Sequence, residues 1–240
     1  MDRLASETRF GDVRLLAHTA STNDVVAAAA DAGAAEGLVV CADYQTAGRG
    51  RLDRRWEARP GDGLLASVLL RPDGLSRTRR GLVASAVALA GRDACRVVAG
   101  VDVAIKWPND LLSDDGRKLA GILAVEAGGG VVVGMGLNVH GAPPGAVCLD
   151  DLAGRRVGRT DLLVGWLYSL DVLVGDWDAV AARYRAECST VGRRVSVELP
   201  GDRSLSGVVD GVDDIGQLVL SGDDGSLHTL AVGDVTHLRW

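Results

Sequence analysis

Nine consecutive residues, Gly48 to Trp56, read Gly-Arg-Gly-Arg-Leu-Asp-Arg-Arg-Trp and gather four arginines and two glycines before a large aromatic side chain. Glycine lets the backbone adopt a positive φ and approach a ligand closely. Arginine presents a planar guanidinium that binds a carboxylate or a phosphate through two hydrogen bonds. We therefore predict that this segment, called the arginine loop below, binds an anion. The alternative at this point is a solvated basic loop.

A second group of reactive types lies at residues 106–110, which read Lys-Trp-Pro-Asn-Asp. Trp107 and Pro108 would form a flat apolar surface beside a cation, an amide and a carboxylate. That combination suits a nucleotide, whose ring packs on an aromatic side chain, and oxygen ligands suit magnesium. The alternative is a proline-stiffened turn with a tryptophan in the hydrophobic core.

Lys118 stands in an otherwise apolar run, Lys-Leu-Ala-Gly-Ile-Leu, that is predicted to be a strand. A lysine that points inward is unfavourable unless it meets an anion. If it points outward it is a surface residue, and alternation along the strand does not decide between the two. Gly121 on the same strand leaves room for a ligand or for another backbone.

Composition limits the classes of function. The chain has 240 residues, of which 47% are hydrophobic, so it can bury a sizeable core. Its formal net charge is −6, so the protein as a whole is not a polyanion binder and any basic function is local.

Several common signatures are missing from the sequence. The first residues lack the apolar core of a signal peptide, and no uncharged apolar run has the length of a membrane span. The four cysteines and four histidines are widely spaced, which predicts reduced, mostly buried cysteines and no zinc site. The glycine fingerprints of dinucleotide and P-loop proteins are absent, as is a nucleophile elbow. We therefore expect a cytoplasmic protein with no membrane association.

The elements that must position these residues form an α+β pattern. Ser21 or Thr22 is predicted to cap a helix from Asp24 to Ala32, and Thr160 to cap a later one. Strands are predicted at Val13–His18, Leu38–Ala42, Gly63–Leu70, Val101–Ile105, Leu111–Leu112, Arg117–Leu123 and Val131–Val139. Further helices are predicted at Ser76–Cys95, Thr160–Asp176 and Trp177–Ser189.

From Gly192 the sequence pattern changes to short β-rich runs separated by Gly-Asp turns. The runs are Val195–Leu199, Leu205–Val212, Gln217–Leu220 and Leu227–Val232. This spacing predicts a small all-β barrel. We therefore expect two domains: residues 1–190, a mixed β-sheet with packed helices, and residues 191–240, a small SH3-like barrel.

In this order, the motifs resemble those of biotin protein ligases of the biotin–[acetyl-CoA-carboxylase] type. The resemblance runs from about Val13 through the C-terminal barrel, and the ordered set is far more specific than any single element. The matching elements are Ser21-Thr22-Asn23, Gln45 before the Gly48-Arg49-Gly50-Arg51 segment and Trp56, residues 106–110, residues 117–123, and Gly134-x-Gly136-x-Asn138.

The resemblance implies a class II synthetase-like catalytic domain and a two-step acyl transfer. Biotin and MgATP would give biotinyl-5′-AMP, which a lysine of a biotin carboxyl carrier domain would then attack. Lys118, Arg49 and Arg51 are the implied catalytic residues. The implied biotin-binding residues are Ser21, Thr22, Asn23, Gln45, Arg49, Gly50, Arg51 and Lys118. The implied ATP-binding residues are Arg51, Lys106, Trp107, Asn109 and Asn138, with Asp110 as a magnesium ligand.

Physical chemistry agrees with these roles. Joining a carboxylate to an α-phosphate brings two anions together, and cations such as Arg49, Arg51 and Lys118 offset their repulsion. The mixed anhydride is labile in water, which gives a purpose to a loop that folds over it.

Two features depart from the family pattern. Asp53 stands where the loop often has a further glycine, although aspartate tolerates left-handed geometry better than most residues. Only about a dozen residues precede the first predicted strand, which leaves no room for the helix-turn-helix of repressor members. We therefore expect no specific DNA binding, and either a monomer or a homodimer.

Two rival functions remain at this stage. The first is a lipoate or octanoate ligase or transferase, which resembles this fold and chemistry. The second is a non-enzymatic nucleic-acid-binding module that uses Arg49 to Arg55 and the barrel. The acidic net charge and the lack of interleaved aromatic residues count against the second.

Overall fold

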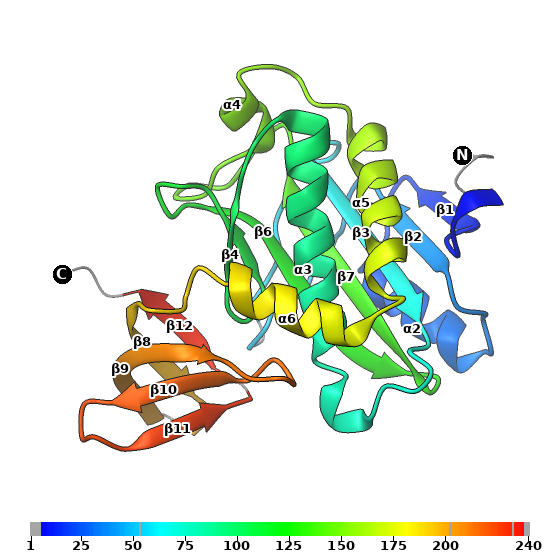
Figure 1. The fold of residues 1–240 in the computed structure, drawn as a ribbon. Helices are drawn as coiled ribbons and strands as arrows, with labels where there is room; N and C mark the ends of the chain where they lie inside the picture. The colour runs from blue at the N-terminus through cyan, green and yellow to red at the C-terminus, as the bar shows by residue number, and fades with distance from the viewer. Residues whose placement is uncertain (1–5, 53, 202, 232, 238–240) are drawn as a thin grey trace.

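A seven-stranded mixed sheet forms the centre of the larger domain (Figure 1). The structure is a computed structural model that describes residues 6–52, 54–201, 203–231 and 233–237. The strand order is β1-β2-β3-β7-β6-β5-β4; β1 and β2 pair in parallel, and the other neighbours pair antiparallel. The strands are β1 (Asp12–Leu16), β2 (Leu38–Ala42), β3 (Gly63–Leu70), β4 (Ala104–Lys106), β5 (Asp110–Leu112), β6 (Lys118–Ala127) and β7 (Gly130–Asn138). The predicted mixed sheet with packed helices is confirmed.

Helices cover both faces of this sheet, which is why its central strands are continuously apolar. Every residue of β2 and β3 is buried. Helix α2 (Thr22–Asp31) packs on one face, where Val26 meets Leu69 and Val132. On the other face lie α3 (Leu82–Ala94), α5 (Arg159–Leu173) and α6 (Trp177–Glu187), which are seen in front of the strands in Figure 1. A buried strand with two covered faces loses the usual apolar–polar alternation.

The helix ends differ from the sequence prediction. Helix α2 starts at Thr22, with Ser21 at the N-cap position but no side-chain capping bond. The predicted cap of α5 at Thr160 is also wrong, because α5 begins at Arg159 after Gly158. Instead, Asp176 caps α6 by accepting hydrogen bonds from the backbone N–H groups of Asp178 and Ala179.

The predicted helix Ser76–Cys95 is split into three segments. Its first part is a 3₁₀ turn, η1 (Arg77–Arg79); α3 follows, and a π-helical segment, η2 (Cys95–Ala99), ends it. Polar side chains at residues 76–80 give this first turn no apolar face to bury, so only the alanine- and valine-rich part packs as an α-helix. The short helix α4 (Leu149–Ala153) was not predicted.

The C-terminal unit is a five-stranded antiparallel sheet in the order β11-β10-β9-β8-β12 (Figure 1). This confirms the small all-β unit, although no ladder joins β11 to β12 within the part of the chain that the structure describes. The strands are β8 (Arg194–Leu199), β9 (Arg203–Val212), β10 (Leu218–Gly222), β11 (Leu227–Leu230) and β12 (Asp234–His237).

Trp107 joins the two sheets. Its side chain is 2% exposed; its ring N–H donates to the carbonyl of Gly216 at 2.9 Å, and its backbone N–H donates to Thr190 at 3.0 Å. Gly216 lies in the turn between β9 and β10, so the C-terminal sheet is docked on the strand exit that carries residues 106–110.

The cysteines and the helix lengths can be compared with the sequence predictions. All four cysteines are free and buried, as predicted. Among the described helices, none is both long and apolar enough to cross a membrane.

Candidate active site

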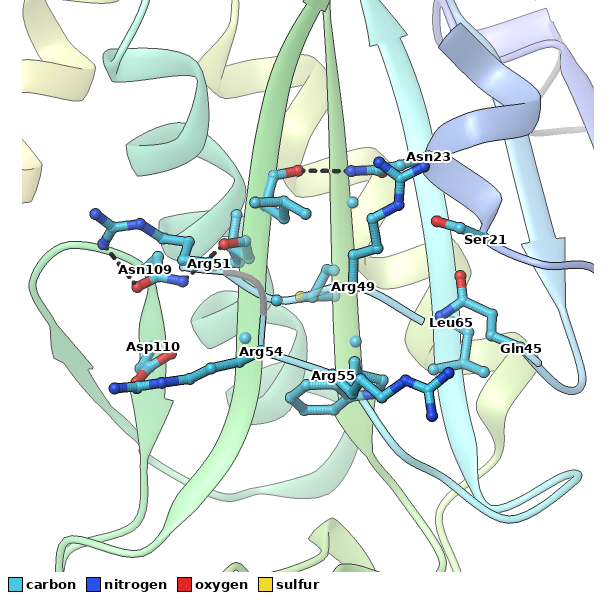
Figure 2. A pocket seen from close by; sticks show the side chains of 18 of the residues that line it. Ser21, Asn23, Gln45, Arg49, Arg51, Arg54, Arg55, Leu65, Asn109 and Asp110 are labelled. Atoms are coloured by element: carbon cyan, nitrogen blue, oxygen red, sulfur yellow. Dashed lines mark hydrogen bonds between the residues drawn. The ribbon is translucent and has the colours of Figure 1, made fainter. Parts of the chain in front are cut away.

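One cavity gathers most of the predicted site residues (Figure 2). It lies between the start of α2, the arginine loop and strands β3, β5, β6 and β7. It encloses about 840 Å³ of empty space, counting the part open to solvent. Its polar and charged lining residues are Ser21, Thr22, Asn23, Gln45, Arg49, Arg51, Arg54, Arg55, Asn109, Asp110, Lys118 and Asp234.

Uncharged hydrogen-bonding groups line one side of the cavity. Gln45 Oε1 accepts hydrogen bonds from the backbone N–H of Thr22 at 2.7 Å and from its hydroxyl at 3.0 Å. Buried Ser67 lies 2.7 Å from the Thr22 hydroxyl and donates to Asn23 Oδ1 at 2.6 Å. The Asn23 amide donates to the carbonyl of Leu123 at 3.0 Å.

This network explains why Thr22 does not act as a helix cap. Its hydroxyl is directed into the cavity wall, where it fixes the orientation of Gln45. Among the described residues, the Ser21 hydroxyl and Gln45 Nε2 make no hydrogen bond with protein, and both residues line the cavity. They are therefore available to a polar, uncharged part of a ligand.

Arg51 and Asp110, with Asn109 beside them, lie across the cavity from Ser21 and Gln45, as Figure 2 shows. Lys118 Nζ lies 2.6 Å from Asp110 Oδ1 and 5.8 Å from the centre of the Trp56 ring. The Arg51 guanidinium donates to Asn109 Oδ1 at 3.3 Å. Burial lowers the pKa of Arg51, opposed by the nearby carboxylates of Asp234 and Asp110, but a guanidinium remains charged at neutral pH. Lys118 thus points into the cavity. Of the two orientations that the sequence left open, the inward one is observed.

The arginine loop is a tight hairpin over the cavity. The N–H of Gly50 donates to the carbonyl of Arg54 at 2.7 Å, and the N–H of Trp56 donates to the carbonyl of Gly48 at 3.0 Å. Leu52, at its tip, has a φ of 54°. Asp53, the departure noted in the sequence, lies outside the described residues.

Two carboxylates hold the outer arginines of this hairpin. Arg49 pairs with Asp24 in the first turn of α2, and Arg54 pairs with Asp234 at the start of β12. Both arginine side chains are 61% exposed. The loop is therefore tied to the larger domain on one side and to the C-terminal sheet on the other.

Glycines form the floor on which Trp56 lies. A Cβ at Gly136 would come 2.5 Å from Cε2 of Trp56, and one at Gly121 would come 3.1 Å from its Cζ3. A Cβ at Gly134 would come 2.3 Å from Asn23 Oδ1. Cβ contacts as short as those at Gly134 and Gly136 essentially never occur, so these two glycines of β7 are needed for the polar network and the tryptophan to reach their positions. At Gly121 in β6 the fit would be tight, and the tryptophan ring would have to shift slightly.

The structure does not bring every predicted residue to this cavity. Ser21, Thr22, Asn23, Gln45, Arg49, Gly50, Arg51, Asn109, Asp110 and Lys118 line it, whereas Lys106, Trp107 and Asn138 do not. Trp107 is in the core, so the alternative of a core tryptophan holds for its ring. Asn138 is 2% exposed and donates to the carbonyl of Val147 at 3.2 Å.

Sequence reasoning missed three contributors. Ser67 is an isolated serine inside an apolar strand, and that exception was the available signal. Trp56 was named as the end of the loop and as part of the family resemblance but not as a site residue, although it forms a wall of the cavity. Asp234 is 180 residues from its partner Arg54, and nothing local in the sequence connects the two.

A second cavity lies on the other side of Trp56. It shares Gln45, Arg55 and Trp56 with the first cavity, and the segment from Gly141 to Pro144 forms another part of its wall. His140 and Asp150 anchor that segment through a 2.8 Å contact between Nδ1 and Oδ2. The two cavities are therefore neighbouring compartments, with Trp56 in the lining of both.

Asp110 is a carboxylate beside the cations that suits magnesium. Asp110 Oδ1 is buried and forms an ion pair with Lys118. It accepts no hydrogen bond from the residues that the structure describes. No group of three or more His, Cys, Asp or Glu side chains that could hold a metal ion occurs among the described residues. Mg²⁺ is commonly held by one or two carboxylates together with substrate phosphates, so Asp110 fits an ion that arrives with a nucleotide.

The comparisons with known proteins agree with the fold and with the order of its two parts. Residues 15–141 match the biotin/lipoate A/B protein ligase family, and residues 190–238 match the biotin protein ligase C terminal domain. These define the general class as ligases of the biotin and lipoate type. More particularly, the chain belongs to the biotin protein ligases, a family of enzymes.

Curated relatives include a biotin–[acetyl-CoA-carboxylase] ligase of Mycobacterium tuberculosis, 38% identical, with 94% of this chain and 88% of the relative aligned. The corresponding ligase of Paracoccus denitrificans is 33% identical over 88% of this chain and 95% of its own. A bifunctional ligase/repressor of Bacillus subtilis is 30% identical over 92% of this chain and 75% of its own.

Solved structures share the fold. The biotin protein ligase of Aquifex aeolicus in complex with biotin and ATP has a TM-score of 0.81 at 22% identity, covering 96% of this chain and 100% of that one. The Leishmania major enzyme in complex with biotinyl-5-AMP has a TM-score of 0.67 at 24% identity, covering 92% and 99%.

Proposed function

We propose that this protein attaches biotin to a lysine of a biotin carboxyl carrier domain in two steps. In the first, a biotin carboxylate oxygen attacks the α-phosphorus of ATP, and pyrophosphate leaves. In the second, the ε-amine of the carrier lysine attacks the acyl carbon of biotinyl-5′-AMP, an amide forms, and AMP and a proton leave. The relatives named as ligases of acetyl-CoA carboxylase support such an acceptor.

The observation that carries this proposal is the two-sided cavity. Ser21 and Gln45 offer free hydrogen-bonding groups on one side, which suits the uncharged ureido ring of biotin. Lys118 and Arg51 lie on the other side, where the biotin carboxylate and the α-phosphate would meet. A fatty-acyl chain would leave the polar side without partners, and unpaired buried polar groups are unfavourable.

The nucleoside of ATP fits the second cavity. Trp56 offers a large apolar ring beside it, and the two cavities share Gln45 and Arg55. ATP bound there would extend its phosphates towards Lys118 and Arg51. In this placement the aromatic partner of the base is Trp56. Trp107, which the sequence suggested for that role, has its ring buried in the core.

The cations promote the first step by stabilising charge. As the carboxylate approaches the phosphate, negative charge accumulates on the oxygens between them, and Lys118 and Arg51 lie where it develops. Asp110 pairs with Lys118 before the ligand binds, which holds the ammonium at the cavity wall. If Mg²⁺ enters with ATP, it neutralises phosphate charge, and Asp110 is the residue that would hold it. The hairpin over the cavity excludes water from the labile anhydride.

Biotin-dependent release of pyrophosphate from ATP, followed by mass measurement of a carrier domain, tests the proposal. We expect release that depends on biotin, and a carrier whose mass rises by one biotinyl group at its acceptor lysine. The enzyme contains only two lysines, Lys106 and Lys118, so self-labelling is easily separated from carrier labelling. Activity with octanoate or lipoate but not with biotin would show that the chain is a lipoyl-type ligase instead.

A further inference from the structure

Asp234 brings the C-terminal sheet into the active-site cavity. It is the first residue of β12, its side chain is 28% exposed, and it lines the same cavity as Lys118 and Arg51. Its carboxylate pairs with Arg54 of the arginine loop. The cavity of the larger domain is therefore completed by a residue from the smaller one.

Arg54 is coupled to the rest of the loop through the backbone. Its carbonyl accepts the N–H of Gly50 at 2.7 Å, which fixes the second limb of the hairpin against the first. Arg49 and Arg51 flank Gly50, so the position of Arg54 affects theirs. Arg51 lies close enough to both for its pKa to be raised by Asp234 and lowered by Arg54.

Arg49 and Arg54 are tied down in different ways. Arg49 meets Asp24 of α2, within the same domain, whereas Arg54 meets a carboxylate of the other domain. If the Arg54 contact is lost, the second limb is still held by its backbone hydrogen bonds and by the Trp56 ring, which lies on Gly136 and below Lys118. The ion pair with Asp234 is thus the side-chain contact that joins this limb to the C-terminal sheet.

We propose that Asp234 is a positioning residue that holds the arginine loop closed through Arg54, so that retention of the acyl-adenylate depends on the C-terminal sheet. The statement about the adenylate rests on the proposed function, whereas the statement about the loop does not. Asp234 contacts no reacting atom in this role. It acts on the chemistry only through the loop.

The first experiment measures the loop without any substrate. Trypsin cleaves after arginine, so the rate of cleavage between Arg51 and Trp56 reports how often the loop opens. We expect Asp234→Asn to raise this rate by up to about fivefold, the range of an exposed ion pair. The matched control is Asp223→Asn, which removes another ion pair of the same sheet, with Arg194, outside the cavity.

The second experiment measures leakage of the intermediate as AMP released per carrier domain labelled. We expect this ratio to rise by up to about fivefold in Asp234→Asn and in Arg54→Asp, and to stay at the wild-type value in Asp223→Asn. The charge-swapped double variant, Asp234→Arg with Arg54→Asp, should bring the ratio back towards the wild type. A residue that merely supports folding would not be rescued by exchanging the charges.

Two results would overturn the proposal: equal loop cleavage in Asp234→Asn and Asp223→Asn, or a charge swap no better than the worse single variant. A wild-type enzyme that makes no pyrophosphate from biotin and ATP would refute the proposed function alone. The trypsin experiment would still decide whether Asp234 holds the loop.

Discussion

At the scale of single residues, the pair between Lys118 and Asp110 is the most informative contact in the cavity. The Asp110 side chain is 16% exposed and that of Lys118 is 42% exposed, so the ammonium is the accessible member. A ligand carboxylate or phosphate can therefore reach Lys118 without first displacing Asp110. An ion pair arranged in this way holds a cation in place for an anion that has yet to arrive.

We expect Lys118→Ala to lower the rate of biotin-dependent pyrophosphate release by about 10²–10³-fold, the effect of removing one donor from a site of developing charge. The loss should appear mainly in kcat, because the charge that Lys118 meets is greatest in the transition state. Stopped-flow or coupled measurement of pyrophosphate gives both constants.

Arg117→Ala is the matched control for Lys118. Arg117 is the neighbouring residue, its side chain pairs with Asp115, and it does not line the cavity. Lys118→Arg separates charge from shape, since it keeps the cation and alters its geometry. Equal rates for Lys118→Ala and Arg117→Ala would remove Lys118 from the mechanism.

At the scale of elements, strand β7 shows how a strand can serve a site through the side chains it lacks. The glycines at 134 and 136 alternate with Met135, so one face of the strand is bare where Asn23 and Trp56 approach. An added methyl group at Gly136 must displace the Trp56 ring or the strand itself.

Gly136→Ala is therefore expected to raise the KM for ATP by about tenfold, equivalent to about 1.4 kcal/mol of lost binding. Trp56 would no longer lie between the two cavities, and the nucleoside would lose its apolar partner. Steady-state kinetics at saturating biotin measures this change. Gly211→Ala in β9, where a new Cβ meets nothing within 4 Å, is the control and should leave the KM unchanged. An unaltered KM in Gly136→Ala would show that Trp56 does not contact the nucleotide.

The strands were the elements best predicted from sequence. β2 and β3 have the predicted bounds because their apolar runs, which only Ser67 interrupts, end abruptly at Asp43 and Arg71. Helix ends were less predictable, since the hydroxyl of Thr22 can serve either a helix cap or a distant partner. Only the fold shows that Gln45 and Ser67 take it.

The candidate site was predictable where its residues lie in compact motifs. Residues 21–23, 49–51 and 109–110 line one cavity, as expected. Trp107 did not, because the direction of its side chain depends on the C-terminal sheet that covers it. Asp234 could not be predicted, because its contact with Arg54 exists only after two sheets have docked.

At the scale of the whole molecule, that docking depends on Trp107. Its ring is buried between the larger domain and the β9–β10 turn, and its N–H satisfies the carbonyl of Gly216. The cavity needs both units, because Asp234 reaches it from β12. Stability and site assembly should therefore be linked through this one side chain.

Trp107→Phe keeps an aromatic ring but removes the donor to Gly216. We expect the free energy of unfolding to fall by about 1–3 kcal/mol, the range for leaving a buried polar group unpaired. For a chain of this size each kcal/mol lowers Tm by about 2–4 °C. Circular dichroism and calorimetry measure this fall in Tm.

The same variant decides between the two roles that Trp107 has been given. A ring that stacks on the base would raise the KM for ATP when it is replaced, whereas a core residue would alter stability and leave the KM of the folded enzyme within about twofold. We expect the second result, because the ring is 2% exposed and its donor is already paired. A large rise in KM without a fall in Tm would return Trp107 to the nucleotide site. Trp56 would then lose the role that its position between the two cavities gives it.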